Sequence, residues 1–227
     1  IEQATIVRSI RDGLVNLIPV LIIGAFALIL NTLPIPFYQD FLNGTAAGGF
    51  FSNIFEMVNK ATFGVLSVYM TFFVSRSYMK IKADSNVDSA GAAVASVLAF
   101  FVLAGANLES FSINEMGPKS MFLALLTALG ASALYIHLQH LFHRHKVLLF
   151  SKGADKEFNR VLSTIIPITI IAIIFALFNE LIILIFNVDS FRHLLIKLFN
   201  ALFSIGENGF IKGFFFVFLS SILWFFG

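Results

Sequence analysis

Residues 161–186 constrain the fold more than any other part of the chain. The run VLSTIIPITIIAIIFALFNELIILIF is the longest apolar stretch, and at about 1.5 Å of rise per residue a helix of this length crosses the ~30 Å hydrocarbon core of a bilayer. Four shorter apolar runs precede it, at residues 13–33, 61–79, 90–104 and 121–138, and one follows at residues 209–227. The pattern predicts an all-α membrane protein with about six transmembrane helices and additional interfacial helices.

The composition indicates that lipid is the surrounding medium. Hydrophobic residues make up 58% of the chain and charged residues 12%, against about 25% charged residues in soluble domains. The net charge of +2 is too small to indicate a nucleic-acid partner. The absence of cysteine excludes disulfides and thiolate metal sites in this chain. Because the sequence opens at Ile1 without a start methionine or a cleavable signal, we expect it to begin inside a longer protein.

The connections between the spans differ in character. Residues 1–12 are predicted to form a short amphipathic helix in the membrane interface, and residues 36–60 a polar-aromatic loop with an amphipathic piece at 51–58. Residues 105–120 form a polar loop that could be partly re-entrant. Residues 191–205 predict an amphipathic helix along the interface. Its apolar face would hold Phe191, Leu194, Leu195, Leu198, Leu202 and Ile205, and its polar face Arg192, His193, Lys197 and Asn200.

Two spans carry packing signals. The third, AGAAVASVLAFFVLA, is rich in small residues, which favours close contact with other helices, and we expect homodimerisation through this span and its neighbours. The first contains Pro19 and Gly24, which bend a membrane helix or let a neighbour approach. Pro34 and Pro36 are expected to end it.

The basic residues predict the orientation, because Lys and Arg are enriched in cytoplasmic connections. One set of alternate connections holds ten of them: Arg8, Arg11, Arg76, Lys80, Lys82, Arg144, Lys146, Lys152, Lys156 and Arg160. The opposite set holds four: Lys60, Lys119, Arg192 and Lys197. The N-terminus is therefore predicted to be cytoplasmic.

An intramembrane acid is the sharpest candidate for a functional group. Asn179 and Glu180 lie inside the longest apolar run, and a carboxylate in hydrocarbon is costly unless it is paired, hydrated or protonated. Glu180 is predicted to contact a ligand or take part in gating. The alternatives are that both residues sit near the outer headgroups, or that Glu180 caps a neighbouring helix. Lys212 is expected to snorkel near Glu207 or to pair with it.

Other polar residues carry no recognisable chemistry. His137, His140, His143 and His145 do not share one helical face, so contact with anionic lipid is favoured over a metal site. No phosphate-binding glycine loop, nucleophile elbow or zinc-protease motif is present. We therefore expect no metal, no cofactor and no catalytic residue in this chain, although it could belong to an enzymatic complex.

The segments, taken in order, resemble the membrane-embedded IIC component of bacterial phosphoenolpyruvate-dependent sugar phosphotransferase systems, within the lactose/cellobiose/diacetylchitobiose group. The matching pieces are RDGLVNLIPVLIIGAFALIL, ATFGVLSVY, GPKSMFLALLTALGASALYIHL, STIIPITIIAIIFALFNELI and SSILWFFG. Each is weak alone, and their order and spacing carry the resemblance. Residues 223–227, LWFFG, are the best single match.

The resemblance implies a mechanism and a domain layout. Such a component, in the bacterial inner membrane, binds an external disaccharide or related sugar and moves a transport domain against a dimeric scaffold. It then presents the sugar to a cytoplasmic IIB partner for phosphorylation. Residues 1–187 would form the five-span scaffold and dimerisation domain, residues 188–208 an amphipathic linker helix, and residues 209–227 the first helix of a truncated transport domain. Asn179, Glu180, Trp224 and Gly227 would border the sugar site.

Two other functions remain open at the level of sequence. IIC-like membrane regions are also found fused to cyclic-di-GMP signalling domains, where they look like sensors, and a third possibility is a purely structural anchor. The residues that follow Gly227 would discriminate a permease from a sensor. For the isolated chain, the resemblance implies neither transport nor sugar affinity.

Overall fold

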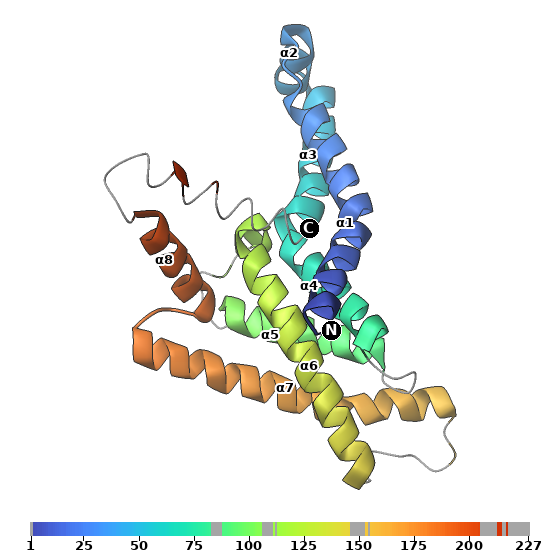
Figure 1. Ribbon diagram of the computed structural model, residues 1–227. Helices are drawn as coiled ribbons and strands as arrows, with labels where there is room; N and C mark the ends of the chain where they lie inside the picture. The colour runs from blue at the N-terminus through green and yellow to red at the C-terminus, as the bar shows by residue number, and fades with distance from the viewer. Residues whose placement is uncertain are drawn as a thin grey trace.

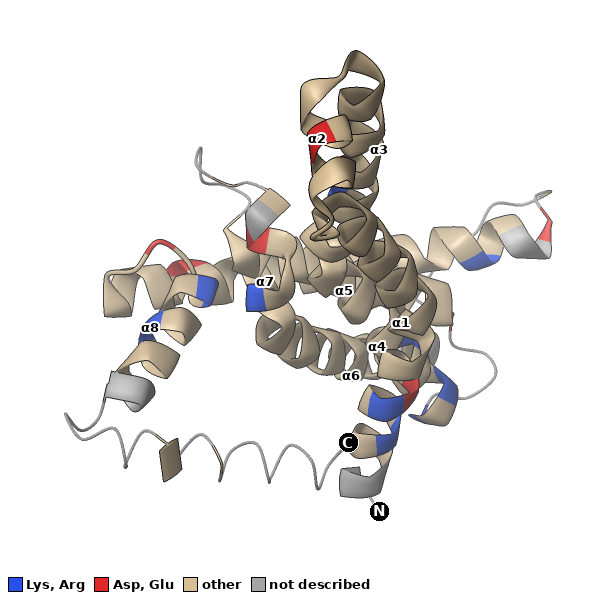
Figure 2. Cartoon of the chain, turned by 90° about the horizontal axis from the view of Figure 1, so that it is seen from above, with Lys and Arg blue, Asp and Glu red and all other residues tan. Residues whose placement is uncertain are grey.

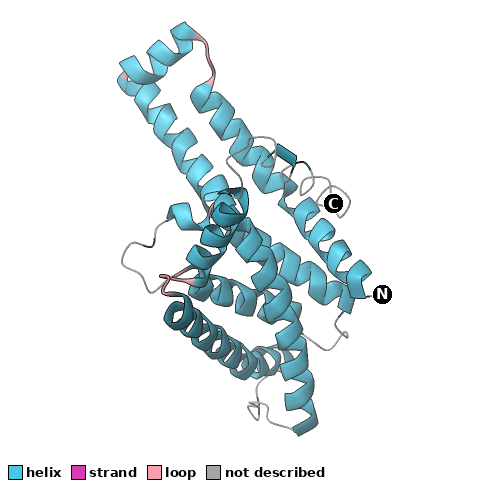
Figure 3. Ribbon diagram, turned by 60° about the vertical axis from the view of Figure 1, so that its left-hand side comes forward, coloured by secondary structure: helices cyan, strands magenta, loops and turns pink. Residues whose placement is uncertain are grey.

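A computed structural model of the chain describes residues 2–82, 88–105, 111, 113–145, 153, 155–204, 213–214 and 217. Its elements are helices joined by short connections (Figures 1 and 3). In chain order they are α1 (Glu2–Thr32), α2 (Pro36–Gly44), α3 (Ala46–Thr62), the 3-10 turn η1 (Phe63–Val65), α4 (Leu66–Lys82), α5 (Ser89–Ala104), the 3-10 turns η2 (Ile113–Met116) and η3 (Pro118–Ser120), α6 (Met121–His145), α7 (Lys156–Phe186) and α8 (Phe191–Ser204). The predicted all-α class is confirmed.

Helix α1 is continuous from the N-terminal region into the first apolar run. It is 31 residues long and contains Pro19 without a break, so the separate interfacial helix predicted at residues 1–12 is wrong. No glycine or proline lies between Glu2 and Asp12 to interrupt the helix. α1 ends at Thr32, just before Pro34 and Pro36, as predicted.

The part of the chain predicted as a loop at residues 36–60 is helical instead. Pro36 opens α2, where its fixed φ suits a first helical turn. Thr45 caps α3, because its hydroxyl accepts a hydrogen bond from the amide of Gly48 at 2.9 Å. The C-terminal part of α1 forms, with α2 and α3, an arm that projects from the rest of the molecule (Figure 1).

Close contact between α1 and the α3–α4 segment depends on two glycines of α1. A Cβ on Gly24 would lie 2.5 Å from Thr62 Oγ1 and 2.9 Å from the Phe63 ring, and a Cβ on Gly13 would lie 2.5 Å from Val74 Cγ2. Neither position has room for a side chain. The prediction that Gly24 lets a neighbour approach is confirmed.

Helix α5 lies at the centre of the bundle, where it contacts α4, α6 and α7. Its small residues Ala92, Ala95, Ser96 and Ala99 are all fully buried, so the close packing predicted for the third span is confirmed. The small-residue face itself is covered by this chain's own helices, and homodimerisation through this span and its neighbours stays a prediction. Val94, at 48% exposure, belongs to the side of α5 that remains on the surface.

Local sequence fixes both ends of α5. The Asp88 carboxylate accepts hydrogen bonds from the amides of Ala90 and Gly91 at 3.3 and 3.1 Å, which caps the first turn. Gly105 adopts φ 93°, a left-handed conformation that glycine takes without strain, and ends the helix.

Four helical stretches are long and apolar enough to cross a membrane: Thr5–Thr32, Ala46–Lys82, Pro118–Phe142 and Phe158–Phe186. Helix α5 is apolar but has 16 residues. These five helices match the first five predicted spans. The sixth, at residues 209–227, lies outside the described residues except for positions 213, 214 and 217. The number of membrane crossings therefore stays a prediction.

Large apolar side chains cover the outside of the long helices. On α7, Leu177, Leu181, Leu184 and Ile185 are 57–78% exposed. In water, such a continuous apolar surface would associate or aggregate. The long apolar stretches at residues 13–32 of α1, 89–104 of α5, 121–142 of α6 and 161–179 of α7 contain no charged residue, and these parts of the helices are tan in Figure 2. This distribution is the one expected of a protein surrounded by lipid.

Two sets of contacts join the connections and helix ends to the bundle. At one end of the bundle, α5 begins beside α6 and α7, because a Cβ on Gly91 would meet Tyr135 and Thr164. At the other end, η1, η2 and η3 pack together, and the Ser67 hydroxyl donates a 2.7 Å hydrogen bond to the Gly117 carbonyl. The connection at 113–120 is thus folded against the bundle.

Candidate functional site

Asn179 and Glu180 occupy the C-terminal part of α7 but have different surroundings. Asn179 is 4% exposed, and its Oδ1 accepts a hydrogen bond from the backbone amide of Phe191 at 2.9 Å. Glu180 is exposed, because successive residues of a helix point about 100° apart. Glu180 lies six residues before the end of α7, about 9 Å along the axis. The capping of a neighbouring helix considered for Glu180 is thus performed by Asn179, which accepts a hydrogen bond from the first residue of α8.

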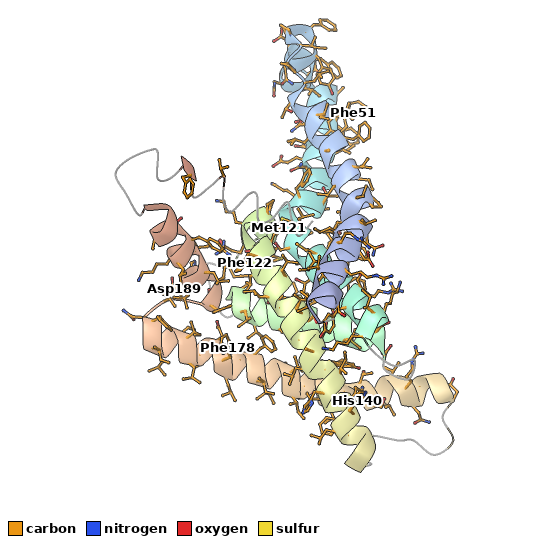
Figure 4. The ribbon with its side chains drawn as sticks, in the orientation of Figure 1. Phe51, Met121, Phe122, His140, Phe178 and Asp189 are labelled. Atoms are coloured by element: carbon orange, nitrogen blue, oxygen red, sulfur yellow. The ribbon has the colours of Figure 1, made fainter. Side chains whose placement is uncertain are left out.

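The connection between α7 and α8 forms a fixed elbow. Asn187 ends α7 in the left-handed conformation, with φ 49°, which asparagine tolerates better than most residues. Ser190 Oγ then accepts a hydrogen bond from the amide of His193 at 3.3 Å, and His193 Nδ1 lies 3.7 Å from the carboxylate of Asp189. Figure 4 shows Asp189 at this corner, beside the first turn of α8.

A buried polar cluster joins α8 to the connection between α5 and α6. Arg192 is 5% exposed, and its Nε donates a 2.8 Å hydrogen bond to the hydroxyl of Ser120. The Ser120 hydroxyl donates to the carbonyl of Glu115 at 2.5 Å. The guanidinium also forms an ion pair with the Glu115 carboxylate, Nη1 against Oε2, without the alignment of a hydrogen bond. Arg192 of α8 is thereby joined to two residues of the connection between α5 and α6, which lies far from it in sequence.

The burial of Arg192 corrects the face predicted for α8. The side chains that line the contact with the start of α6 are Arg192, Leu195, Ile196 and Phe199, which recur at the three- and four-residue spacing of one helix face. Leu198, assigned to the apolar face of a helix predicted to lie along the membrane interface, is 54% exposed and lies outside this contact. The docked face is therefore rotated relative to the prediction, because one arginine finds a partner inside the protein.

A second buried polar cluster lies where α4, α5 and α6 cross. The hydroxyls of Ser75 and Ser132 are 2.7 Å apart, and that of Ser96 lies 3.0 Å from Ser75 Oγ. All three residues are fully buried. Hydrogen bonds between membrane helices satisfy hydroxyls that lipid cannot, so this cluster holds the three helices in register.

A third polar contact lies in the C-terminal part of α6. Tyr135 is fully buried, and its hydroxyl accepts a 3.1 Å hydrogen bond from the amide of Gln139. His140 lies one turn beyond Tyr135 on the same helix (Figure 4). Within the part of the chain that the structure describes, no group of three or more His, Cys, Asp or Glu side chains could hold a metal ion.

Several predicted residues lie outside the described part of the chain. Trp224 and Gly227 are among them, as are Lys212 and Glu207. Of the four residues predicted to border the sugar site, the structure therefore describes Asn179 and Glu180, and the assignment of the four to one site stays a prediction.

An apolar groove runs between α4 and α5 on the outside of the bundle. It has a volume of about 460 Å³ and is lined by Val68, Tyr69, Phe72, Phe73, Val94, Val97 and Leu98. No charged side chain lines it, so the groove suits acyl chains or apolar side chains rather than a sugar.

Comparison with known families decides what kind of membrane protein has this fold. Residues 11–227 match the model of the family described as Phosphotransferase system, EIIC. The chain belongs to the EIIC family. The resemblance identified from the sequence pieces is confirmed.

Named relatives of this EIIC chain share about a quarter of its sequence. The lichenan permease IIC component of Bacillus subtilis is 25% identical over 70% of this chain and 37% of its own length. The oligo-beta-mannoside-specific EIIC component of the same species is 23% identical over 97% of this chain and 50% of its own length. The cellobiose-specific EIIC component of Geobacillus stearothermophilus is 24% identical over 70% of this chain and 37% of its own length. The EIIC chain thus spans half or less of the length of these relatives.

A solved structure has the same fold. The transporter ChbC, the IIC component from the N,N'-diacetylchitobiose-specific phosphotransferase system, superposes with a TM-score of 0.71 at 21% identity, over 88% of this EIIC chain and 48% of ChbC. The fold described above is therefore that of a helical IIC transporter.

Sequence reasoning missed the polar clusters of this EIIC chain. Arg192 and Glu115 were assigned to separate connections, and of the three serines only Ser96 was considered, as one of the small residues of the third span. A signal was available for Arg192, which falls in register with Leu195, Ile196 and Phe199. For the serines, the signal was a hydroxyl in the interior of each of three consecutive apolar spans.

Proposed function

We propose that this chain is the membrane scaffold part of a IIC sugar permease, with a linker helix and the beginning of a transport domain. The observation that carries the proposal is the family match over residues 11–227. The apolar exterior of α7 supports a membrane location, here taken as the bacterial inner membrane with a cytoplasmic N-terminus. The tightly packed centre around α5 supports a stationary role, because a scaffold must keep its shape while another domain moves.

The natural protein would translocate a disaccharide or a related saccharide, which a cytoplasmic IIB partner then phosphorylates. Support comes from relatives named for lichenan, oligo-beta-mannosides and cellobiose, and from a fold shared with a component named for N,N'-diacetylchitobiose. Within that protein, this chain provides a fixed frame in the bilayer.

Uptake by cells tests the proposal directly. Cells that express the full-length natural protein with its IIA and IIB partners are given labelled cellobiose, N,N'-diacetylchitobiose and a β-mannobiose. We expect at least one sugar to accumulate as its phosphate, and only when IIB is present. Failure of every sugar to accumulate, in cells where the protein reaches the membrane, would contradict the proposal.

Glu180 is proposed to border the sugar path, with Trp224 and Gly227. The exposed carboxylate on α7 supports this assignment, since an acid without buried partners is available to accept hydrogen bonds from sugar hydroxyls. Asn179 is proposed to act indirectly, by holding the connection between α7 and α8 in place beside Glu180, because its Oδ1 already accepts a hydrogen bond from the amide of Phe191.

A measurement of sugar binding tests whether Glu180 contributes to the site more than another exposed acid does. We expect the transported sugar to raise the Tm of the full-length protein, and Glu180→Gln to abolish that increase. Asp40→Asn is the matched control, because Asp40 is an exposed acid on α2, within the arm. Equal sugar stabilisation in wild type and Glu180→Gln would remove Glu180 from the site.

We propose that the scaffold is a homodimer that meets its partner through apolar surface outside the small-residue face of α5. The α4–α5 groove and the exposed apolar side chains of the arm support such contacts, for example Phe37 at 84% and Phe50 at 63% exposure. Crosslinking in native membranes should give a dimer. Recovery of monomer alone would contradict this arrangement.

A further inference from the structure

Contacts of three kinds hold α8 against the rest of the chain. At its first residue, the Phe191 amide donates to Asn179 Oδ1 of α7. One residue later, Arg192 contacts both Ser120 and Glu115. Two turns further, the ring of Phe199 packs edge-to-face on Phe122 with 5.1 Å between centroids. The contacts extend along more than half of α8.

The Arg192 cluster is the contact that is hardest to open. Its side chain is 6% exposed and that of Glu115 is 27% exposed, so lifting α8 would leave both charges without their partner in a weakly polar environment. Ser120, also buried, would lose its hydrogen bond to Arg192 at the same time. Arginine suits this place because its planar head can address a hydroxyl and a carboxylate together.

The other side of α8 has a different character. Lys197, Leu198 and Asn200 are exposed, and within the described residues no hydrogen bond or ion pair joins them to the scaffold. Figure 4 shows α8 beside the start of α6, where Phe122 lies. One face of α8 is therefore bound to the scaffold, and the opposite face is open.

We propose that Arg192, Glu115 and Ser120 form a clamp that keeps α8 on the scaffold throughout the transport cycle. The moving part of the protein then begins after Ser204, and the elbow at Asn187 is a rigid joint rather than a hinge. The inference rests on the proposed transport function. Helix α8 was predicted to be a linker between two domains. According to this proposal it belongs to the scaffold and does not move relative to it.

Hydrogen exchange tests the clamp without any transport measurement. In detergent or nanodiscs, Arg192→Gln is expected to raise the amide exchange rate of α8 at least tenfold and to leave α5 unchanged. Arg192→Lys should give an intermediate rate, because one ammonium cannot reproduce both contacts. Lys197→Gln is the matched control, since it removes one positive charge from the exposed face of the same helix.

The exchange experiment has clear negative outcomes. Wild-type exchange in α8 of Arg192→Gln would overturn the clamp, and so would an equal increase in Lys197→Gln. Should Arg192→Gln fail to fold, Glu115→Gln is used, which removes the opposite charge and keeps an acceptor. The same tenfold increase is expected, and its absence overturns the proposal.

A crosslink tests whether α8 stays in place during transport. This chain has no cysteine, so Phe122→Cys with Phe199→Cys can be joined by a short bis-methanethiosulfonate reagent in a full-length protein free of other cysteines. We expect sugar uptake within about twofold of the same variant after reduction. Loss of uptake on crosslinking and recovery on reduction would overturn the clamp. Absence of uptake in the wild type would instead contradict the proposed function, and hydrogen exchange would still decide the clamp.

Discussion

Replacing Gly13 by alanine should push α1 away from α4. A Cβ at this position would lie 2.5 Å from Val74 Cγ2, 2.8 Å from Val74 Cα and 3.0 Å from its backbone nitrogen. Two of these three atoms belong to the backbone, so a change of side-chain rotamer cannot relieve the clash. Val74 is fully buried, and the two helices must separate or slide.

The expected loss follows from two opposing terms. Overpacking a close contact costs about 1–3 kcal/mol, and replacing a helical glycine by alanine contributes about 0.5–1 kcal/mol in the other direction. Taking the middle of each range, the net destabilisation of Gly13→Ala is about 1 kcal/mol. Gly130→Ala is the matched control, because its Cβ would make an ordinary contact, 3.8 Å from Phe175 Cζ. That variant should gain about 0.5–1 kcal/mol.

Unfolding by SDS titration in mixed micelles, followed by circular dichroism, measures both variants. Adding Val74→Ala to Gly13→Ala should recover part of the loss, because it removes the 2.5 Å contact and leaves the backbone contacts. Equal stability of Gly13→Ala and wild type would refute the argument. Strictly additive losses in the double variant would refute the specific contact with Val74.

Three further substitutions test separate contacts by the same unfolding assay. Asn179→Ala should cost about 1 kcal/mol, because the amide of Phe191 loses its capping acceptor; no loss would show that water replaces it. Ser75→Ala should cost about 0.6–1.7 kcal/mol by removing the 2.7 Å contact with Ser132, and a stabilised variant would contradict a role in register. Gly48→Ala should lower stability more than Gly13→Ala, because the new Cβ would collide with a backbone carbonyl of α2; proteolysis of the arm should then become faster, and an unchanged cleavage rate would contradict the clash.

The membrane helices were predictable because hydrocarbon imposes a length and a polarity on each of them. The apolar composition and length of residues 161–186 leave few alternatives to a membrane-spanning helix. The small residues of the third span indicated close packing against other helices. The ends of helices also followed local rules, since Asp88 and Gly105 act within one turn of the backbone they cap.

The connections were less predictable. Residues 36–60 were predicted as a loop because their polar and glycine content is typical of turns, yet α2 and α3 form there, and α3 packs along α1. Gly48 was read only as a turn residue. In the structure it lets α3 approach the backbone of Phe41 and Leu42 in α2, whereas Gly24 gives room to the side chains of Thr62 and Phe63, as the sequence indicated.

The candidate site was likewise predictable in part. That Asn179 and Glu180 were unusual inside an apolar run could be read from the sequence, because a polar group in hydrocarbon is always costly. Which of them faced inwards could not be read, since adjacent residues on a helix differ by about 100° and packing alone decides the rotation.

The sequence by itself determined that lipid surrounds this chain, where five of its helices lie and to which family it is similar, because these follow from apolar length, from residues close together in the chain and from their order. Only the tertiary structure decided that Arg192 turns inwards to Glu115, that three serines from three helices meet, and that the small face of α5 is already covered. Each of these depends on which residues distant in sequence become neighbours, and a pattern along one helix carries no information about its partner.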